Sequence, residues 1–225
     1  LWGVMIDTTS RPVRMVFTGR AAGDLSLEDT RRALGEKLGI ERQVWMEQLH
    51  TNTVTVVDGA TASPVEATDA IVTTTPKLAL CVKVADCVPV LLADHAAGVI
   101  AAAHAGRMGA RNGIVRNTVE TMVELGATPA NIQALLGPAA AGESYEVPQD
   151  MADDVEKHLP GSCTRTKQGT PGIDVRAGLV RQLLGLGVTH IDADPRDTIT
   201  DPDFFSYRRE GQTGRQAGII WLTGA

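Results

Sequence analysis

Short apolar runs bounded by Gly, Pro or Asp alternate along the chain with segments whose apolar residues recur every three or four positions. The runs are rich in β-branched residues and have the length of buried strands, so they predict β-structure. The predicted strands cover residues 12–19, 43–50, 53–59, 69–75, 78–86, 88–94, 98–105, 132–137, 188–192 and 217–222. The segments 43–50 and 53–59 are expected to meet at a short turn.

The segments with the longer period predict helices, because apolar residues three and four positions apart lie on one helix face. These helices cover residues 26–40, 112–125, 149–159 and 174–187. Ser26 and Asp174 stand at expected N-caps, and Gly126 stands where a helix ends. The two patterns together predict an α/β fold, a mixed sheet with flanking helices in a single domain over residues 1–225, with 160–173 as a surface loop.

The bulk composition is that of an ordinary globular protein, with 43% hydrophobic and 21% charged residues. The formal net charge of -6 argues against a nucleic-acid binder, although clustered arginines still allow a small anionic substrate. The longest apolar stretch, residues 88–106, carries charged and imidazole groups, so we interpret it as two strands and expect no membrane span and no signal peptide. The 3 cysteines cannot all pair within one chain, which favours a cytoplasmic location.

Three residues that end or adjoin predicted strands are the strongest candidates for chemistry: His50, Cys87 and His104. Two imidazoles and one thiolate form a reasonable zinc set that leaves a fourth position for water or substrate. Zinc would lower the pKa of that water to roughly 7. The spacings of 37 and 17 residues match no compact zinc motif, so a buried cysteine with hydrogen-bonded core histidines remains the alternative.

The same residues also allow a cysteine nucleophile. Cys87 would attack, His104 would act as its base, and Asp86 or a loop amide would orient the imidazole. Such a pair does not need His50, and the second histidine therefore favours the metal.

The glycines at 106, 109 and 113 allow a phosphate loop, but neither the P-loop pattern nor the dinucleotide pattern fits their spacing. What remains is an anion site at the start of the helix 112–125, or simply a tight turn from strand to helix.

Two loops near the C-terminal half carry candidate ligand contacts. In 204–216, aromatic rings beside arginines can stack on a base and bind phosphate, or form a solvated basic hairpin anchored by its phenylalanines. The side chains concerned are Phe204, Phe205, Arg208, Arg209 and Arg215. In 137–147, Tyr145 and Glu146 are either ligand contacts or turn residues.

Five motifs occur in the order found in the YfiH (DUF152) family, whose members are called laccase-domain proteins, polyphenol oxidases, peptidoglycan editing factors or purine nucleoside phosphorylases. They are EQLH at 47–50, ADCVPVLLAD at 85–94, AAAHAG at 101–106, GPA…YEV at 137–147 and FFSYRR…TGR at 204–215. The chain resembles this family from about Phe17 onward. The resemblance implies a single α/β domain related in outline to Cys–His hydrolases of the toxin deamidase type.

The resemblance also implies zinc ligands at His50, Cys87 and His104, with copper possible at the same site. The implied activity is phosphorolysis of adenosine, inosine, guanosine and methylthioadenosine, accompanied by adenosine deamination. The expected partners are therefore a purine nucleoside and phosphate. The catalytic residues expected are Cys87, His104 and Asp86, and the expected substrate and phosphate contacts are Arg20, Gln48, Tyr145, Arg208 and Arg209.

The chain departs from the family pattern beside the third ligand. Family members read His-Ala-Gly-Trp-Arg-Gly, whereas Arg107 and Met108 stand here in place of Trp and Arg. Thr51 replaces a glycine, and Asp197 replaces the cysteine of a Cys-Thr pair. If the lost side chains shape the pocket, the substrate or the activity differs in this chain.

A four-copper laccase needs about ten histidines, so the 5 histidines of this chain exclude it. A cysteine hydrolase or amidase of peptidoglycan-type substrates would use Cys87 as its nucleophile, and a regulatory member would bind metal without turnover. Nothing in the sequence indicates the oligomeric state.

Overall fold

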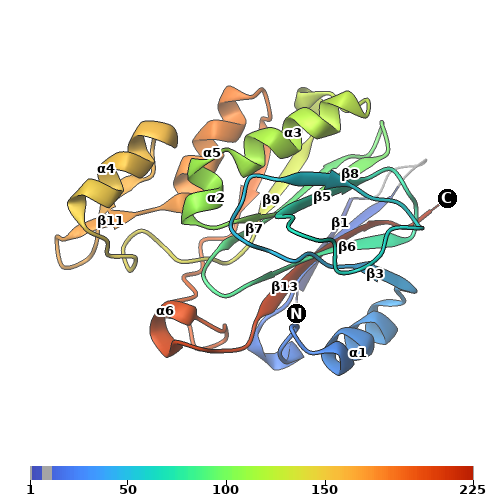
Figure 1. Cartoon of the computed structure of the whole chain (residues 1–225), viewed down its shortest axis with the longest axis horizontal. Helices are drawn as coiled ribbons and strands as arrows, with labels where there is room; N and C mark the ends of the chain where they lie inside the picture. Colours follow the sequence, from blue (N-terminus) through green and yellow to red (C-terminus); the bar gives the residue numbers. More distant parts are fainter. Residues whose placement is uncertain (1, 7–11, 225) are drawn as a thin grey trace.

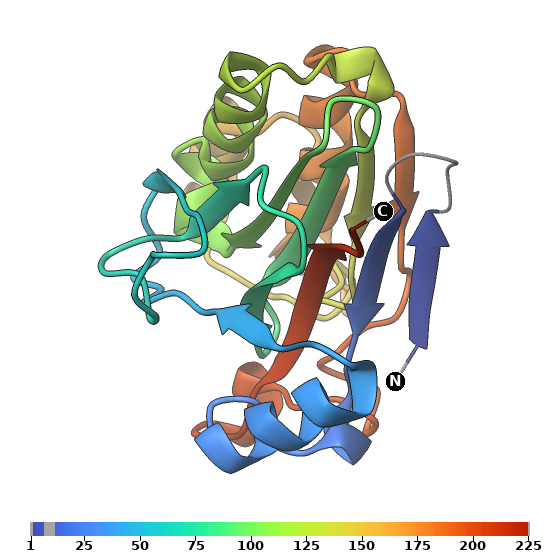
Figure 2. The ribbon, with the colours of Figure 1, turned by 90° about the vertical axis from the view of Figure 1, so that its right-hand side faces the viewer.

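Two β-sheets pack face to face in a computed structural model that describes residues 2–6 and 12–224 (Figures 1 and 2). The five-stranded sheet has the order β1 (Trp2–Ile6), β2 (Val13–Phe17), β13 (Gln216–Leu222), β6 (Leu78–Val84), β3 (Arg42–Val44). The six-stranded sheet has the order β12 (His190–Ala193), β9 (Gln133–Leu136), β7 (Val88–Asp94), β8 (Val99–Ala105), β5 (Ala70–Thr73), β4 (Val54–Val56).

Helices cover the outer faces of both sheets (Figure 1). The six-stranded sheet is covered by α2 (Arg107–Arg111), α3 (Ile114–Glu124) and α5 (Val175–Gly185). The outer face of the five-stranded sheet packs against α1 (Glu28–Leu38). Next to α2 lies α4 (Gln149–His158), which packs on the hairpin of β10 (Cys163–Arg165) and β11 (Pro171–Ile173). The short α6 (Tyr207–Glu210) precedes β13, and two 3-10 turns cover Arg20–Ala22 and Pro129–Asn131.

The central strands are apolar throughout because they are buried on both faces. In β8, Ile100 and Ala102 pack against the opposite sheet, whereas Ala101 and Ala103 pack under the helices. Side chains alternate along a strand, so His104 continues the face of Ile100 and Ala102 and points toward the five-stranded sheet. The strand thus delivers an imidazole to the place where the two sheets end.

The α/β fold with a mixed sheet and flanking helices is confirmed, but parts of the chain differ from our predictions. The segments 43–50 and 53–59 do not form a hairpin, because β3 pairs with β6 in one sheet and β4 pairs with β5 in the other. The expected loop at 160–173 contains the β10–β11 hairpin. Helix formation after β8 begins at Arg107 rather than at Asn112. No helix within the described ranges has the length and apolar character needed to cross a membrane.

Candidate active site

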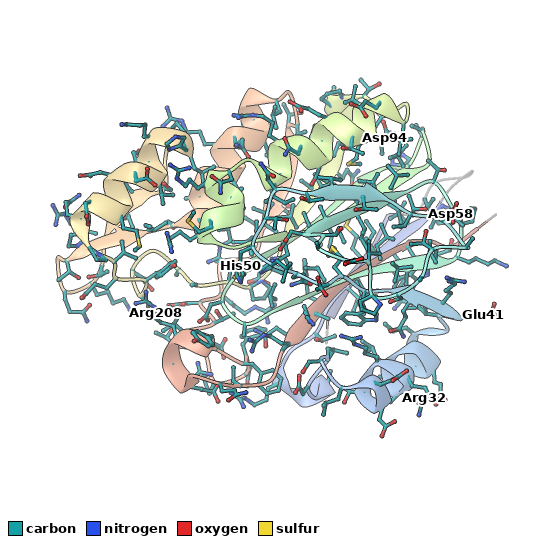
Figure 3. The ribbon with its side chains drawn as sticks, viewed as in Figure 1. Arg32, Glu41, His50, Asp58, Asp94 and Arg208 are labelled. Atoms are coloured by element: carbon teal, nitrogen blue, oxygen red, sulfur yellow. The ribbon has the colours of Figure 1, made fainter. Side chains whose placement is uncertain are left out.

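A pocket of about 580 Å³ opens where β6 and β8 end, and residues from both sheets line it. Its wall includes His50, Cys87 and His104, which come from three separate segments of the chain. Figure 3 shows His50 and Arg208, which both line this pocket, in the region between α2 and α6. Arg208 belongs to α6, so the C-terminal segment closes one side of the pocket.

The candidate ligands form one group, with all of their donor atoms within 4.8 Å of one another. His50 lies in the β3–β4 loop with a left-handed φ of 61°, and its ring centroid is 4.8 Å from that of His104 in an edge-to-face arrangement. Cys87 follows Asp86, which has a φ of 95° in the turn from β6 to β7. The three residues identified in the sequence are therefore brought together, while their role as metal ligands remains a prediction.

Asp69, a residue not predicted to belong to the site, organises this group. Its carboxylate is fully buried and accepts a hydrogen bond of 2.7 Å from Nδ1 of His104. It also accepts bonds from the backbone amides of the 49–51 loop, at 3.1, 3.0 and 2.9 Å, and from the hydroxyl of Thr51 at 2.8 Å. A carboxylate on Nδ1 fixes the tautomer and leaves Nε2 of His104 to face the pocket.

The electrostatics of the pair follow from burial and from these hydrogen bonds. Burial alone would lower the pKa of His104, but the charge of Cys87 and the hydrogen bonds with Asp69 and Cys87 raise that pKa to about 9. Burial would raise the pKa of Asp69, yet hydrogen bonds from His104 and Thr51 hold it well below its usual range. A metal must therefore displace a firmly held proton from His104 at neutral pH.

His50 is in the opposite situation. Burial, followed by the neighbouring His104, lowers the pKa of His50 below its ordinary value. Its ring is thus neutral near pH 7 and ready to donate a lone pair.

The donor set fits a zinc ion. Tetrahedral zinc with bonds of about 2.0–2.3 Å keeps its ligand atoms about 3.5 Å apart, so the cluster needs a contraction of about 1 Å. A Cβ at Gly106 would lie 2.9 Å from Sγ of Cys87 and 2.9 Å from Nδ1 of His50. The absence of a side chain at Gly106 is what lets both donors approach this point. Two imidazoles and one thiolate leave a fourth position open to the pocket.

Asp86 has a different place from the one expected. Its carboxylate accepts hydrogen bonds from the hydroxyl of Thr198 at 2.7 Å, the hydroxyl of Ser206 at 3.0 Å and the amide of Arg208 at 2.7 Å. Asp69, not Asp86, binds the imidazole of His104. Asp86 instead ties the β6–β7 turn, beside Cys87, to the start of α6.

Two of the three arginines expected to bind phosphate do not line the pocket. Arg20 donates to the carbonyls of residues 202 and 204 and to Glu210. Arg209 donates to four backbone carbonyls, of residues 198, 199, 201 and 204, and to Glu210. Arginine content alone could not show that backbone carbonyls occupy these guanidinium groups.

The other expected contacts do line the pocket. Arg208 lies 4.7 Å over the ring of Tyr145 and donates to the carbonyl of Glu146. Gln48 uses both ends of its amide on the backbone of Lys83, at 2.7 and 3.0 Å. Arg107 and Met108, the departures from the family pattern, also line the pocket, as do Lys83 and Tyr207, which were not predicted to do so. Arg215, proposed as a phosphate contact only in general terms, lines the pocket as well.

Comparison with known proteins places this site in a family. A protein of Corynebacterium glutamicum named purine nucleoside phosphorylase is 57% identical over 96% of this chain and 97% of its own length. A protein of Mycobacterium tuberculosis with the same name is 52% identical over 85% of this chain and 78% of its own length.

Solved structures agree in fold. A Neisseria meningitidis DUF152 protein superposes with a TM-score of 0.83 and 28% identity, covering 99% of each chain. YlmD of Geobacillus stearothermophilus superposes with a TM-score of 0.82 and 27% identity, covering 95% of this chain and 92% of its own. The family model described as multi-copper polyphenol oxidoreductase laccase matches residues 16–223. The chain therefore belongs to this laccase-like family, which is the family of the DUF152 and YfiH proteins.

Proposed function

We propose that the chain is a zinc-dependent purine nucleoside phosphorylase that acts on adenosine, inosine, guanosine and methylthioadenosine and also deaminates adenosine. The observation that carries the proposal is the grouping of His50, Cys87 and His104 within 4.8 Å in a pocket large enough for a nucleoside. The 57% identity to a protein named purine nucleoside phosphorylase supports the choice of substrate.

The chemistry can be assigned to groups of this chain. Zinc held by His50, Cys87 and His104 would supply a Lewis acid and a bound water of lowered pKa. Asp69 keeps the proton on Nδ1 of His104, so that the lone pair of Nε2 remains available to the metal. Tyr145, backed by the guanidinium of Arg208, offers an aromatic face on which a purine can stack.

The two reactions place different demands on the pocket. In phosphorolysis, a phosphate oxygen bonds to the anomeric carbon while the bond to the purine nitrogen breaks, and the electron pair leaves with the purine. In deamination, water adds to the ring carbon that carries the amino group, and ammonia leaves. Both reactions need the nucleoside held firmly beside the ligand group.

The same donors could bind one copper ion, but the chain cannot be a four-copper laccase. The four-copper mechanism needs about ten histidines. Besides His50 and His104, the chain has three others, and the structure places them in the β7–β8 turn, at the end of α4 and in β12. The multi-copper chemistry in the family's description is therefore not proposed for this chain.

A second candidate function is favoured by one specific contact pattern. Sγ of Cys87 lies within 4.8 Å of a ring nitrogen of His104, and His104 hydrogen-bonds to the buried Asp69, which is the order of groups in a cysteine-hydrolase triad. Without metal, these groups could open an amide of a peptidoglycan-type substrate. A third reading, a regulatory member without turnover, takes its support from Arg107 and Met108 on the pocket wall.

Elemental analysis of the purified protein, coupled to an assay with adenosine and phosphate, tests the proposal. We expect about one zinc per chain, adenine with ribose 1-phosphate, and a smaller yield of inosine. Because Cys163 is exposed and Cys87 only partly so, a Cys163→Ser background serves as the control for alkylation of Cys87. Amide hydrolysis by metal-free protein, abolished by that alkylation, would favour the hydrolase. Bound metal without turnover of any nucleoside would favour the regulatory member.

A further inference from the structure

Two cationic side chains share the pocket with the candidate ligands, and neighbouring strands supply them. Lys83 lies near the end of β6, and Arg215 immediately precedes β13. In the antiparallel pairing of these strands, Ala217 lies opposite Lys83, so Arg215 is two residues from that partner and on the same face. Diagonal neighbours of this kind lie about 7–8 Å apart, which long side chains can span. Both cations can therefore contact one small ligand.

Among residues 2–6 and 12–224, none of the ion pairs includes Lys83 or Arg215. The charge of Asp24 acts on both Lys83 and Arg215, and its carboxylate accepts hydrogen bonds from the amide and hydroxyl of Ser26 and from the amide of Arg215. The described lining of the pocket carries four cationic side chains, those of Lys83, Arg107, Arg208 and Arg215, in a chain whose net charge is -6.

One carboxylate does lie on the described wall of the pocket, that of Asp86. It is occupied by its three hydrogen bonds from Thr198, Ser206 and Arg208. These bonds direct it toward α6, and a single carboxylate against four cationic side chains leaves the described lining with a net positive charge.

The pair is held in place before any ligand arrives. Gln48 binds both the amide and the carbonyl of Lys83, which extends the sheet edge beyond β3 and fixes the backbone of this lysine. Arg215 donates from Nη1 to the carbonyls of Thr213 and Gly214, so Nε and Nη2 remain for a ligand. Burial, and then the charges of Arg31 and Arg215, lower the pKa of Lys83. An anion between the two cations would relieve that repulsion.

We propose that Lys83 and Arg215 form an anion subsite of the pocket that binds a phosphate dianion. An arginine fork and a lysine point charge from two strands suit a tetrahedral oxyanion. This inference rests on the proposed function, which makes inorganic phosphate the ligand; the phosphoryl group of a nucleotide is the other source of the same chemistry. The pair takes the place of Arg20 and Arg209, which are bound elsewhere.

The direct test is calorimetric titration of inorganic phosphate into the metal-loaded full chain, without nucleoside. Lys83→Gln leaves the fold intact, because no hydrogen bond in the described part of the chain uses the ammonium group of Lys83. We expect Lys83→Gln and Arg215→Gln each to weaken phosphate binding about ten- to a hundredfold, the loss typical of a charged hydrogen bond. Arg215→Lys should recover part of it, and Arg116→Gln, on the exposed face of α3, should bind as the wild type does.

Kinetics separate this inference from the proposed function. In phosphorolysis, the Gln variants should raise the KM for phosphate by the same factor and leave the KM for the nucleoside unchanged. Phosphate binding that is unchanged in both Gln variants would overturn the subsite, even in an active phosphorylase. Binding that depends on both residues, in a protein that turns over no nucleoside, would support the subsite and remove the proposed function. If the Gln variants bind adenosine 5′-monophosphate more weakly but bind inorganic phosphate as the wild type does, inorganic phosphate is not the ligand of the subsite.

Discussion

Asp69→Asn is the most direct test of how the candidate metal group is built. Oδ1 of Asp69 accepts from the amides of Leu49 and Thr51 and from the hydroxyl of Thr51, and Oδ2 accepts from His50 and His104. An asparagine keeps the larger set by placing its oxygen at the Oδ1 position. Its NH2 group then faces the two remaining N–H donors.

The magnitude follows from these two lost contacts. A hydrogen bond to a charged group contributes about 1.5–3 kcal/mol, so the variant should lose about 3–6 kcal/mol of folding free energy. Loss of the carboxylate behind a histidine ligand typically weakens metal binding about ten- to a hundredfold. The loss of folding free energy is large against a total stability of about 5–15 kcal/mol, yet the variant should still fold at low temperature.

The pH of the assay decides which effect is seen. The wild-type His104, with its pKa raised to about 9, must release a proton when metal binds below that pH. Removing Asp69 weakens the hold on this proton, which partly offsets the loss of orientation. We therefore expect the full ten- to hundredfold loss of zinc affinity at pH 9 and above, and a narrower gap at pH 7.

Zinc competition with a chromophoric chelator, at 10 °C and across this pH range, measures the effect. Asp94→Asn is the matched control, because Asp94 is equally buried and accepts two backbone amides, from Ala97 and Thr128, far along β7 from the ligands. It should lose stability and keep its zinc affinity. A folded Asp69→Asn protein that binds zinc as tightly as the wild type at pH 9 would refute the assigned role.

Three further predictions concern the same pocket. Gly106→Ala should abolish stoichiometric zinc binding, because its Cβ would lie 2.9 Å from a donor atom of Cys87 and of His50. Gly185→Ala, with open space around it, should bind zinc normally. Equal zinc content in the two variants would contradict the close approach of Cys87 and His50 to Gly106. Because folding raises the pKa of His104 from 6.5 to about 9, this group stabilises the metal-free protein below pH 6.5 and ceases to do so as the pH rises through 9. Calorimetry on chelator-treated protein should show the melting temperature falling over that pH range. The His104→Gln variant should lack this pH-dependent fall. Asp86→Ala should raise the KM for the nucleoside about tenfold, roughly 1.4 kcal/mol, by releasing Arg208, with zinc content unchanged. Asp86→Asn should restore most of it, because the amide can still bond to Thr198 and Ser206; an Asn variant as impaired as Ala would instead indicate proton transfer by Asp86.

Most strands and most helices were predictable, because burial on both faces leaves a continuous apolar run and a helix face leaves a period of three to four; β1, β10 and β11 were not predicted. β7 lies at 88–94 as predicted, and α4 lies within a residue of the predicted 149–159. The false hairpin at 43–59 arose because a short connection does not reveal that its two strands join different sheets. Pairing between strands distant in the sequence is set by tertiary packing, which local patterns do not record.

The candidate ligands were predictable and the group that orients them was not. Histidines and a cysteine at strand ends are conspicuous in the sequence. Asp69 looks like an ordinary polar residue before an apolar run, and its importance arises only when the loop from Leu49 to Thr51 folds over it. The same limit applies to Arg20 and Arg209, whose guanidinium groups bind carbonyls that only the folded chain brings near.

The architecture explains why the ligand spacings resemble no compact metal motif. The chain passes from the five-stranded to the six-stranded sheet twice, between β3 and β4 and between β6 and β7. His50 lies on the first crossing and Cys87 on the second, while His104 ends the strand that pairs with β7. A bound metal would therefore join both crossings to the six-stranded sheet at one point, a link that Asp69 already makes for the first crossing through its hydrogen bonds. Separations of 37 and 17 residues follow from this arrangement, because the chain forms β4, β5 and β6 between the first two ligands and most of β7 and β8 between the last two.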